Sequence, residues 1–349
     1  MASLPFHHLI SLQPLGLLYG SSGRFLSAEN LTGLAGEHFP PDSPAFAGLI
    51  AAHLSAEKLR HLHTAGPFWC RLDEPDLDLR LPAPFTLLQQ ADGAVVARLE
   101  WSAQTGAWCP DRSFGAKPRQ GGWVRLSQWG QWTAPDLAVA ANPWQAVSHL
   151  HPRLEDDQRV SAQEAALFLE LAMAMEPGAA LAYLSSEAIP AGCYRFGGEG
   201  HLVQLRCHPI PRRLIALLEP DRGYGPEEPI ALLTPGVWGS RQLSTREPID
   251  TGRPPPTHPW RVHQQGVGIL TDRPRPWRFR LGSGRQGSAS RRLSRGRWCM
   301  PAGSCYALPD GLRLPAWSDW PESWFPREGF SFRHFGTALA VPLNGLPSS

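Results

Sequence analysis

The sequence has 349 residues, of which 42% are hydrophobic and 18% are charged, and its formal net charge is only +2. This composition excludes a charged, disordered tail, and the length suffices for roughly two domains with separate cores. The 34 glycines and 36 prolines predict many loops and turns and few long helices. Because no apolar run approaches bilayer length and no Lys or Arg precedes the first apolar run, we expect a cytoplasmic protein without a membrane span or signal peptide.

The cysteines argue against a metal site and against a disulfide framework. All six are scattered along the chain, and none forms a C-x-x-C pair. Zinc sites need closely spaced ligand pairs, and disulfides are rare in reducing compartments. We therefore expect reduced cysteines, no metal and no other cofactor.

The first elements along the chain are predicted to be a strand, a loop and a helix. Residues 7–12 form an apolar run that a proline ends, and the Gly-Ser loop that follows carries Arg24 and Phe25. Ser43 is a favourable N-cap, Pro44 suits the first helical turn, and apolar residues then recur at helical spacing. A strand followed by a capped helix is typical of the opening of a ferredoxin-like or RNA-recognition-like unit.

Residues 66–150 are predicted to be strands and loops with many tryptophans. Asp92 and Gly93 predict the turn of a hairpin. Large aromatic side chains pack in cores and interfaces more often than they stack on bases, so we interpret this part as an insertion that packs in the core or is covered by a partner. Its tryptophans are Trp101, Trp108, Trp123, Trp129, Trp132 and Trp144.

The segment at residues 161–176 is predicted to be an amphipathic helix. Ser161 and Glu164 form a capping box, and a Pro-Gly pair follows the segment. Four apolar residues recur at the helical spacing i, i+3, i+4 and i+7. These residues are Phe168, Leu171, Ala172 and Met175.

The rest of the chain is predicted to consist mainly of strands. Residues 193–207 contain a glycine-rich turn that leads into an alternating strand, and residues 336–343 form a terminal strand. Short apolar runs at residues 212–220, 229–237 and 265–270 are interpreted as buried strand segments.

Arginines are concentrated in the C-terminal part of the chain. Residues 241–297 contain thirteen arginines and three acidic residues, which gives this part a net charge of +10. The rest of the chain therefore carries a net charge of −8. Residues 275–306 hold eight of these arginines without any Asp, Glu or Lys, and glycines, serines and aromatics are interleaved. Guanidinium groups bind phosphates bidentately and stack on bases, so the stretch is typical of a loop that holds a polyanion, and a solvated basic loop fits it equally well.

Short motifs along the chain carry a resemblance to a known family. They are PLGLLYGSSGRF at residues 14–25, FPPDSPAFAGLI at 39–50, GGEGH at 197–201, PAGSCY at 301–306 and EGFSFRHFGTALAVP at 328–342. In this order they resemble the motifs of a RAMP-superfamily subunit of Cmr-type (type III-B) CRISPR effector complexes, the subunit that holds the 5′ tag of the guide RNA (crRNA). The counterpart in a related type III subtype fits as well.

The resemblance implies a fold, a function and a set of partners. The implied fold is α+β, with two ferredoxin-like RAMP domains: residues 1–208 with the tryptophan-rich insertion, and residues 209–349 with the Arg/Gly-rich loop. The implied function is that of a non-catalytic scaffold in antiviral defence, which binds the crRNA 5′ tag. The implied protein partners are the large polymerase-like subunit and the repeating backbone RAMP subunit.

Several residues are then expected to contact the tag. Arg24 and Phe25 contact it or stack on it, and backbone amides around Gly303 and Ser304 donate hydrogen bonds. A set of arginines is expected to neutralise its phosphates. These are Arg278, Arg280, Arg285, Arg291, Arg292, Arg295 and Arg297.

The sequence leaves two other functions open. One is a metal-independent endoribonuclease that processes precursor crRNA with a histidine as general acid or base, although no nearby acid completes such a site. Its candidates are His7, His8, His38, His61, His63, His149 and His151. The other is an assembly subunit whose arginines pair with acidic protein surfaces.

Overall fold

The computed structural model describes residues 3–20, 38–74, 76–115, 117–152, 167–197, 200–252, 254–262, 266–281 and 293–345. In these ranges strands dominate, and the α-helices are short: α1 (Ser43–Ala51), α2 (Ala56–Arg60) and α3 (Arg212–Leu218). The fold is therefore sheet-rich with few helices, as the composition predicted. No helix of the described part has the length and apolar character needed to cross a bilayer.

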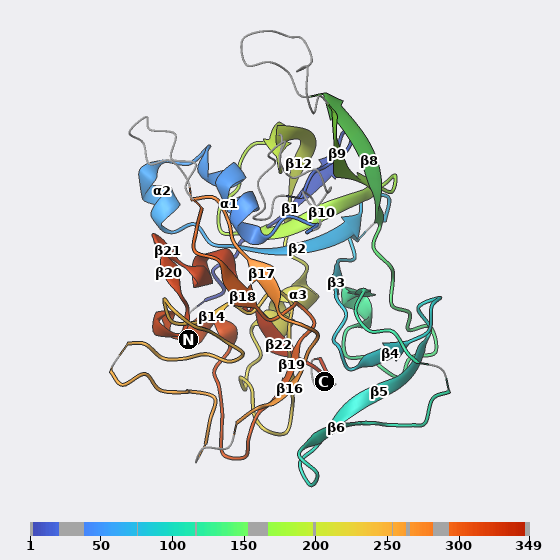
Figure 1. The fold of residues 1–349 in the computed structure, drawn as a ribbon, viewed down its shortest axis with the longest axis vertical. Coiled ribbons are helices and arrows are strands. Elements are labelled where there is room, and N and C mark those ends of the chain that lie inside the picture. The colour runs from blue at the N-terminus through green and yellow to red at the C-terminus, as the bar shows by residue number, and fades with distance from the viewer. Residues whose placement is uncertain are drawn as a thin grey trace.

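A seven-stranded antiparallel sheet forms the upper half of the molecule in Figure 1. Its spatial order is β11 (Gly192–Phe196), β12 (His201–Pro209), β1 (His8–Pro14), β10 (Ala179–Ser185), β2 (Thr64–Arg71), β3 (Arg80–Pro82) and β7 (Trp123–Arg125). The predicted first strand is β1, which pairs with β10 and β12. The predicted alternating strand is confirmed as β12, which pairs with β11. Gly198 and Glu199 of the predicted glycine-rich turn lie outside the described residues.

Helix α1 covers one face of this sheet. The rings of Phe46 and Tyr183 stack with their centroids 4.5 Å apart, and both side chains are fully buried. The helix is confirmed, but its N-cap is Asp42 rather than Ser43. The Ser43 hydroxyl instead hydrogen-bonds the hydroxyl of Thr64 at 2.8 Å, and so joins the helix to β2.

The predicted helix near residue 170 is wrong. Leu167–Met175 is strand β9, which pairs with β8 (Trp144–Pro152) along its whole length to form a ribbon that stands out at the top right of Figure 1. Two backbone hydrogen bonds between Leu18 and Met173 attach the ribbon to the body. Apolar residues also recur here with a period of two, and pairing with β8 decides between the two periods. The predicted capping box lies outside the described residues.

The predicted strand at residues 212–220 is also wrong, because Arg212–Leu218 forms helix α3. Pro211 is the N-cap, where the missing N–H of proline removes no hydrogen bond of the helix. Leu214, Leu217 and Leu218 lie at helical spacing and are buried. A short apolar run of this kind fits a strand or a helix equally well, and here the residues around it decide.

Small antiparallel sheets make up the lower half of the molecule in Figure 1. Four strands lie in the order β16 (Gly268–Leu270), β19 (Cys305–Ala307), β13 (Ile230–Leu232) and β22 (Ala340–Pro342), which confirms the predicted strands near residues 230, 268 and 340. The hairpin around Asp92 is also confirmed, within the sheet β4 (Leu87–Gln89), β5 (Val95–Ser102) and β6 (Ala107–Pro110).

Three two-stranded ribbons complete the C-terminal part of the fold. They are β14 (Trp238–Gly239) with β15 (Ser244–Thr245), β17 (Arg275–Trp277) with β18 (Arg297–Cys299), and β20 (Arg327–Glu328) with β21 (Phe330–Ser331). Single turns of 3₁₀ helix cover Leu126–Gln128, Trp317–Asp319, Glu322–Trp324 and Phe332–Phe335.

Trp123, Trp129 and Trp132 of the insertion are buried in the core, as predicted for this part of the sequence, whereas Trp101, Trp108 and Trp144 are partly buried. The indole N–H groups of Trp129 and Trp132 donate to the carbonyls of Pro342 (3.0 Å) and Leu343 (2.9 Å), so the insertion is fastened to the terminal strand. One hydrophobic cluster contains buried residues from both sides of residue 208. The boundary at that residue stays a prediction.

Candidate nucleic-acid interface

The segment that begins at β17 alternates between core and surface. Trp277 is buried and Phe279 is partly buried, whereas Arg278 and Arg280 are exposed. Hydrogen bonds between Phe279 and Ser294 (3.0 and 2.8 Å) continue the pairing of the two chain segments beyond β17 and β18. Because successive side chains of an extended segment point to opposite sides, the two exposed arginines lie on the same, outward side.

An exposed tryptophan lies on the partner strand. The side chain of Trp298 is 57% exposed, although its neighbours on β18, Arg297 and Cys299, are buried. Pro276 is its partner across the ribbon, and the N–H of Trp298 donates to the Ser244 hydroxyl (3.1 Å), which holds β18 beside β15. We call this outward side the arginine–tryptophan face, formed by Pro276, Arg278, Arg280 and Trp298.

The sequence prediction did not include Trp298. Tryptophan is buried in most proteins, so nothing in the sequence singled this one out for exposure. The alternation along β18 provides the reason, since Arg297 and Cys299 occupy the inward positions on either side. An exposed indole on the same side of a ribbon as exposed arginines offers a flat surface on which a nucleic-acid base can stack.

Arg278 and Arg280 take part in none of the ion pairs found among the described residues. The Nε of Arg278 donates to the carbonyl of Ser294 at 2.7 Å, which orients a side chain that remains exposed. Arginines whose charge is not matched by a neighbouring carboxylate attract phosphates most strongly.

Arg275, the first arginine of this stretch, points inward and has a structural role. Its guanidinium forms two hydrogen bonds to the Asp42 carboxylate (2.7 and 3.2 Å), and His38 lies 3.1 Å from the same carboxylate. Burial alone would raise the pKa of Asp42, but Arg275 and His38 hold it well below its usual range. This ion pair joins β17 to the start of α1.

Arg297 is also engaged within the protein. Its side chain is 4% exposed, and its Nη1 donates to the carbonyl of Ser240 at 2.7 Å. Its Nη2 lies 3.4 Å from Glu328, and its guanidinium lies over the ring of Phe332 at 5.3 Å. Arg295 is exposed, and its Nη1 donates to a backbone carbonyl, so of these two predicted arginines it is the more accessible.

Gly303 and Ser304 form a buried turn. The N–H of Gly303 donates to Leu232 O (2.7 Å), and that of Ser304 donates to Pro301 O (3.2 Å). Gly303 has a φ of +89°, and a Cβ atom there would lie 2.5 Å from Ala83 O, so only glycine fits. The two amides that we expected to donate to RNA are therefore used inside the fold. The predicted residues Arg24, Phe25, Arg285, Arg291 and Arg292 lie outside the described residues.

The histidines do not form an evident acid–base site in the described part of the chain. Asp42 beside His38 is already paired with Arg275, and Glu247 beside His258 is already paired with Arg261. His334 lies 3.9 Å from Glu322, which is beyond hydrogen-bond distance. The described residues also contain no group of three or more His, Cys, Asp or Glu side chains that could hold a metal ion.

The histidine at the entry to β2 is packed against the C-terminal part of the chain. The rings of His63 and His334 stack with centroids 4.2 Å apart. Burial, and then the neighbouring His334, lowers the pKa of His63 to about 4. A ring that resists protonation in this way suits a packing role.

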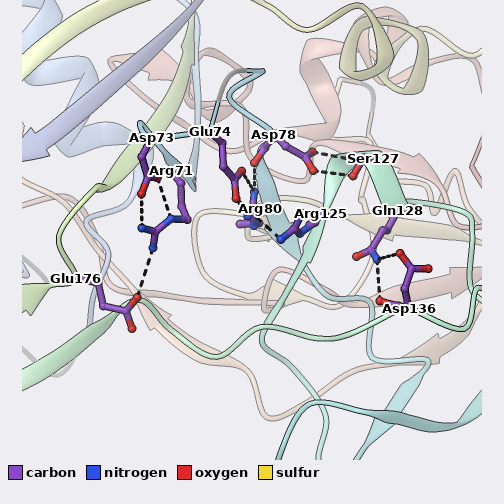
Figure 2. Close-up of polar contacts among 10 residues, drawn as sticks. All are labelled: Arg71, Asp73, Glu74, Asp78, Arg80, Arg125, Ser127, Gln128, Asp136 and Glu176. Carbon is purple, nitrogen blue, oxygen red and sulfur yellow. Dashed lines mark hydrogen bonds and ion pairs between the residues drawn. The ribbon is translucent and has the colours of Figure 1, made fainter.

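A second set of arginines lies at the acidic segment before β3, and Figure 2 shows its contacts. Arg80 is 4% exposed and donates to both oxygens of Glu74 (2.5 and 2.9 Å), and its guanidinium lies over the ring of Trp69 at 5.3 Å. Arg71 donates to both oxygens of Asp73 (2.9 and 2.6 Å). These arginines are matched by carboxylates, and so differ from those of the arginine–tryptophan face.

No protein-family model and no curated protein matches the sequence. Among solved structures, a chain of the type III-B Cmr-beta complex bound to cognate target RNA and AMPPnP is 11% identical, with a TM-score of 0.46 and coverage of 85% of each chain. A chain of the Csm1–Csm4 cassette in complex with pppApA is 13% identical, with a TM-score of 0.36 and coverage of 98% of this chain and 99% of that one. A chain of the Csm3–Csm4 subcomplex of the type III-A interference complex is 9% identical, with a TM-score of 0.35 and coverage of 87% and 93%. All three of these chains come from type III CRISPR complexes.

Proposed function

We propose that this chain is a non-catalytic subunit of a type III CRISPR effector complex and binds single-stranded RNA on its arginine–tryptophan face. The observation that carries the proposal is the exposed indole of Trp298 on the same side of the ribbon as Arg278 and Arg280, neither of which has a carboxylate partner among the described residues. Stacking of a base on an aromatic side chain contributes about 1–3 kcal/mol, and arginines hold the adjoining phosphates.

The finer parts of the proposal rest on the motifs in the sequence. We infer that the bound strand is the crRNA and that the segment held is its 5′ tag. The partners that we propose on the same grounds are the large polymerase-like subunit and the repeating backbone RAMP subunit. Two ferredoxin-like domains, residues 1–208 and 209–349, and a cytoplasmic location complete the proposal. The antiparallel sheet covered by α1 supports the first of these domains.

The first test is to purify the tagged chain from its host, sequence the bound RNA and identify the bound proteins. Guide RNAs with a common 5′ end, recovered intact together with a polymerase-like large subunit, are the expected result. A chain that is free of RNA would contradict the proposal. RNA cut at a fixed position by the purified chain would favour an endoribonuclease instead.

The second test removes the stacking surface alone. Trp298→Ala is expected to weaken binding of a short single-stranded RNA about tenfold or more, because one stacked base is lost. Trp298→Phe should keep part of this affinity. Phe114→Ala removes another exposed aromatic (38% exposed), which lies on the loop after β6, and serves as the control that should bind RNA normally. Normal affinity in Trp298→Ala would exclude stacking at this site.

A further inference from the structure

A pocket of about 620 Å³ opens where the three arginine-bearing ribbons meet. Its wall includes Arg241 from the turn after β14, Arg297 from β18 and Arg327 from β20, with Phe325 and Pro326 as an apolar side. Arg241 and Arg327 are exposed, and neither takes part in an ion pair found among the described residues. We call this the three-arginine pocket.

Arg297 is held rigidly at the wall of this pocket. Its hydrogen bond to the carbonyl of Ser240 connects it to the turn that carries Arg241. Its contacts with Glu328 and with the ring of Phe332 fix the guanidinium on two other sides. A positive charge that is fixed before a ligand arrives loses little conformational entropy when it binds one.

The positive charge around the pocket exceeds the negative charge. The residues that line the pocket include three arginines and no carboxylate. Glu328, which lies between the lining residues Arg327 and Gly329, accepts from the backbone N–H of Arg295 (3.0 Å) and from the Nη2 of Arg297 (3.4 Å). The Nε of Arg297 is buried and has no hydrogen-bond partner. Burial lowers the pKa of Arg297, Glu328 offsets part of this effect, and Arg295 adds to it. An anion in the pocket would relieve this imbalance.

We propose that the three-arginine pocket binds one phosphate group of a nucleotide. Guanidinium groups that approach from three chain segments match the several acceptor oxygens of a phosphate, and the apolar side suits a sugar or a base. The volume of about 620 Å³ lies within the usual range for small-ligand sites. The inference rests on the proposed function in one respect: the expected nucleotide is part of the RNA strand that also contacts Trp298.

The pocket and the arginine–tryptophan face can serve one strand because of their positions on β18. Arg297 and Trp298 are consecutive, so their side chains point to opposite sides of the ribbon. Arg295 and Gly296, just before β18, are exposed. An RNA strand that passes around this end of β18 would contact Trp298 on one side of the ribbon and the pocket on the other.

The test compares two double variants of the full chain that lose the same charge. Arg241→Ala with Arg327→Ala removes the two exposed arginines of the pocket. Arg112→Ala with Arg313→Ala removes two surface arginines elsewhere, with side chains 56% and 62% exposed, and is the control. Circular dichroism and thermal unfolding are expected to show that both variants fold normally, since none of the four side chains is buried.

Two ligands distinguish the source of the phosphate. Titration calorimetry measures the binding of a ten-nucleotide single-stranded RNA and of AMP. Adenosine, which has no phosphate, is the uncharged reference for both ligands. The pocket variant is expected to lose at least about tenfold in affinity for RNA, and the control less than about twofold. A loss for RNA only assigns a backbone phosphate, and a loss for AMP only assigns a free nucleotide. If the pocket variant binds both ligands with unchanged affinity, the proposed phosphate site is wrong.

The salt dependence tests whether the arginines share one phosphate. Each phosphate contact on single-stranded RNA contributes about 0.7 to the slope of log affinity against log salt concentration. Arg241→Ala, Arg327→Ala and the double variant should each lower the slope by about 0.7. If the double variant lowered the slope by about 1.4, twice the effect of either single variant, the two arginines would contact separate phosphates, and this would contradict a single site. Trp298→Ala keeps the two proposals apart: if it leaves RNA binding unchanged while the pocket variant weakens AMP binding, the proposed function fails and the pocket stands.

Discussion

The two sets of arginines in this protein differ in what surrounds them. Arg71 and Arg80, at the acidic segment before β3, each donate to both oxygens of a carboxylate. Arg278 and Arg280 lie on an outward side with no carboxylate partner among the described residues. The comparison teaches that arginine content alone does not identify a nucleic-acid site. The site that we propose instead rests on arginines that are accessible and unmatched, and on the exposed tryptophan on the same side of their ribbon.

The largest effect on stability is expected for the arginines that are matched by carboxylates, Arg71 and Arg80. Arg80→Ala should lower the free energy of unfolding by about 2–4 kcal/mol, because it leaves Glu74 with only the more distant Arg125 (4.0 Å) and removes the guanidinium from the ring of Trp69. Urea denaturation followed by circular dichroism measures this change. The folded variant should bind RNA as the unchanged protein does. Weaker RNA binding without loss of stability would contradict the division between the two sets.

Arg278 and Arg280, which have no carboxylate partner among the described residues, should matter for RNA binding and not for stability. Arg278→Ala with Arg280→Ala should change the free energy of unfolding by no more than about 0.5 kcal/mol, because both side chains are exposed. Two lost phosphate contacts should lower the slope of log affinity against log salt concentration by about 1.4. RNA titrations at four salt concentrations measure the slope, with Arg112→Ala and Arg313→Ala as the charge-matched control. An unchanged slope would assign these arginines to a protein interface.

The sequence predicted the parts of the fold that depend on local signals. The Ser-Pro start of α1, the hairpin at Asp92 and the alternating strand β12 each depend on a few adjacent residues. The segment at β9 was mispredicted because its apolar residues fit periods of both two and 3.6. Its state is decided by pairing with β8, which lies earlier in the chain.

The candidate site was predictable in composition but not in geometry. The sequence located the arginines, but their directions depend on distant partners. Arg275 turns inward because Asp42, which lies 233 positions earlier, accepts its hydrogen bonds. Arg297 turns inward toward Ser240 and Glu328. Once these partners take the inward positions, strand alternation turns Trp298 to the outside, and no local signal reveals this.

Acidification should separate stability from RNA binding. The pKa of His63 is lowered to about 4 by burial and by His334, whereas an unfolded histidine titrates near 6.5. Between these values the unfolded chain binds more protons than the folded chain, so the free energy of unfolding should fall as the pH drops from 6.5 to 4, by about 1–3 kcal/mol.

Urea denaturation at pH 7.0, 5.5 and 4.5 measures this loss, and His63→Gln should show a shallower decrease with pH. Arginine side chains stay charged over the same range, so the protein that remains folded at pH 5.5 should bind RNA with the affinity that it has at pH 7. A parallel loss of RNA affinity in the folded protein would place a titrating group on the arginine–tryptophan face. Stability that does not change with pH would instead mean that the stacked pair of His63 and His334 accepts a proton without cost, and that burial of the His63 ring does not oppose its charge.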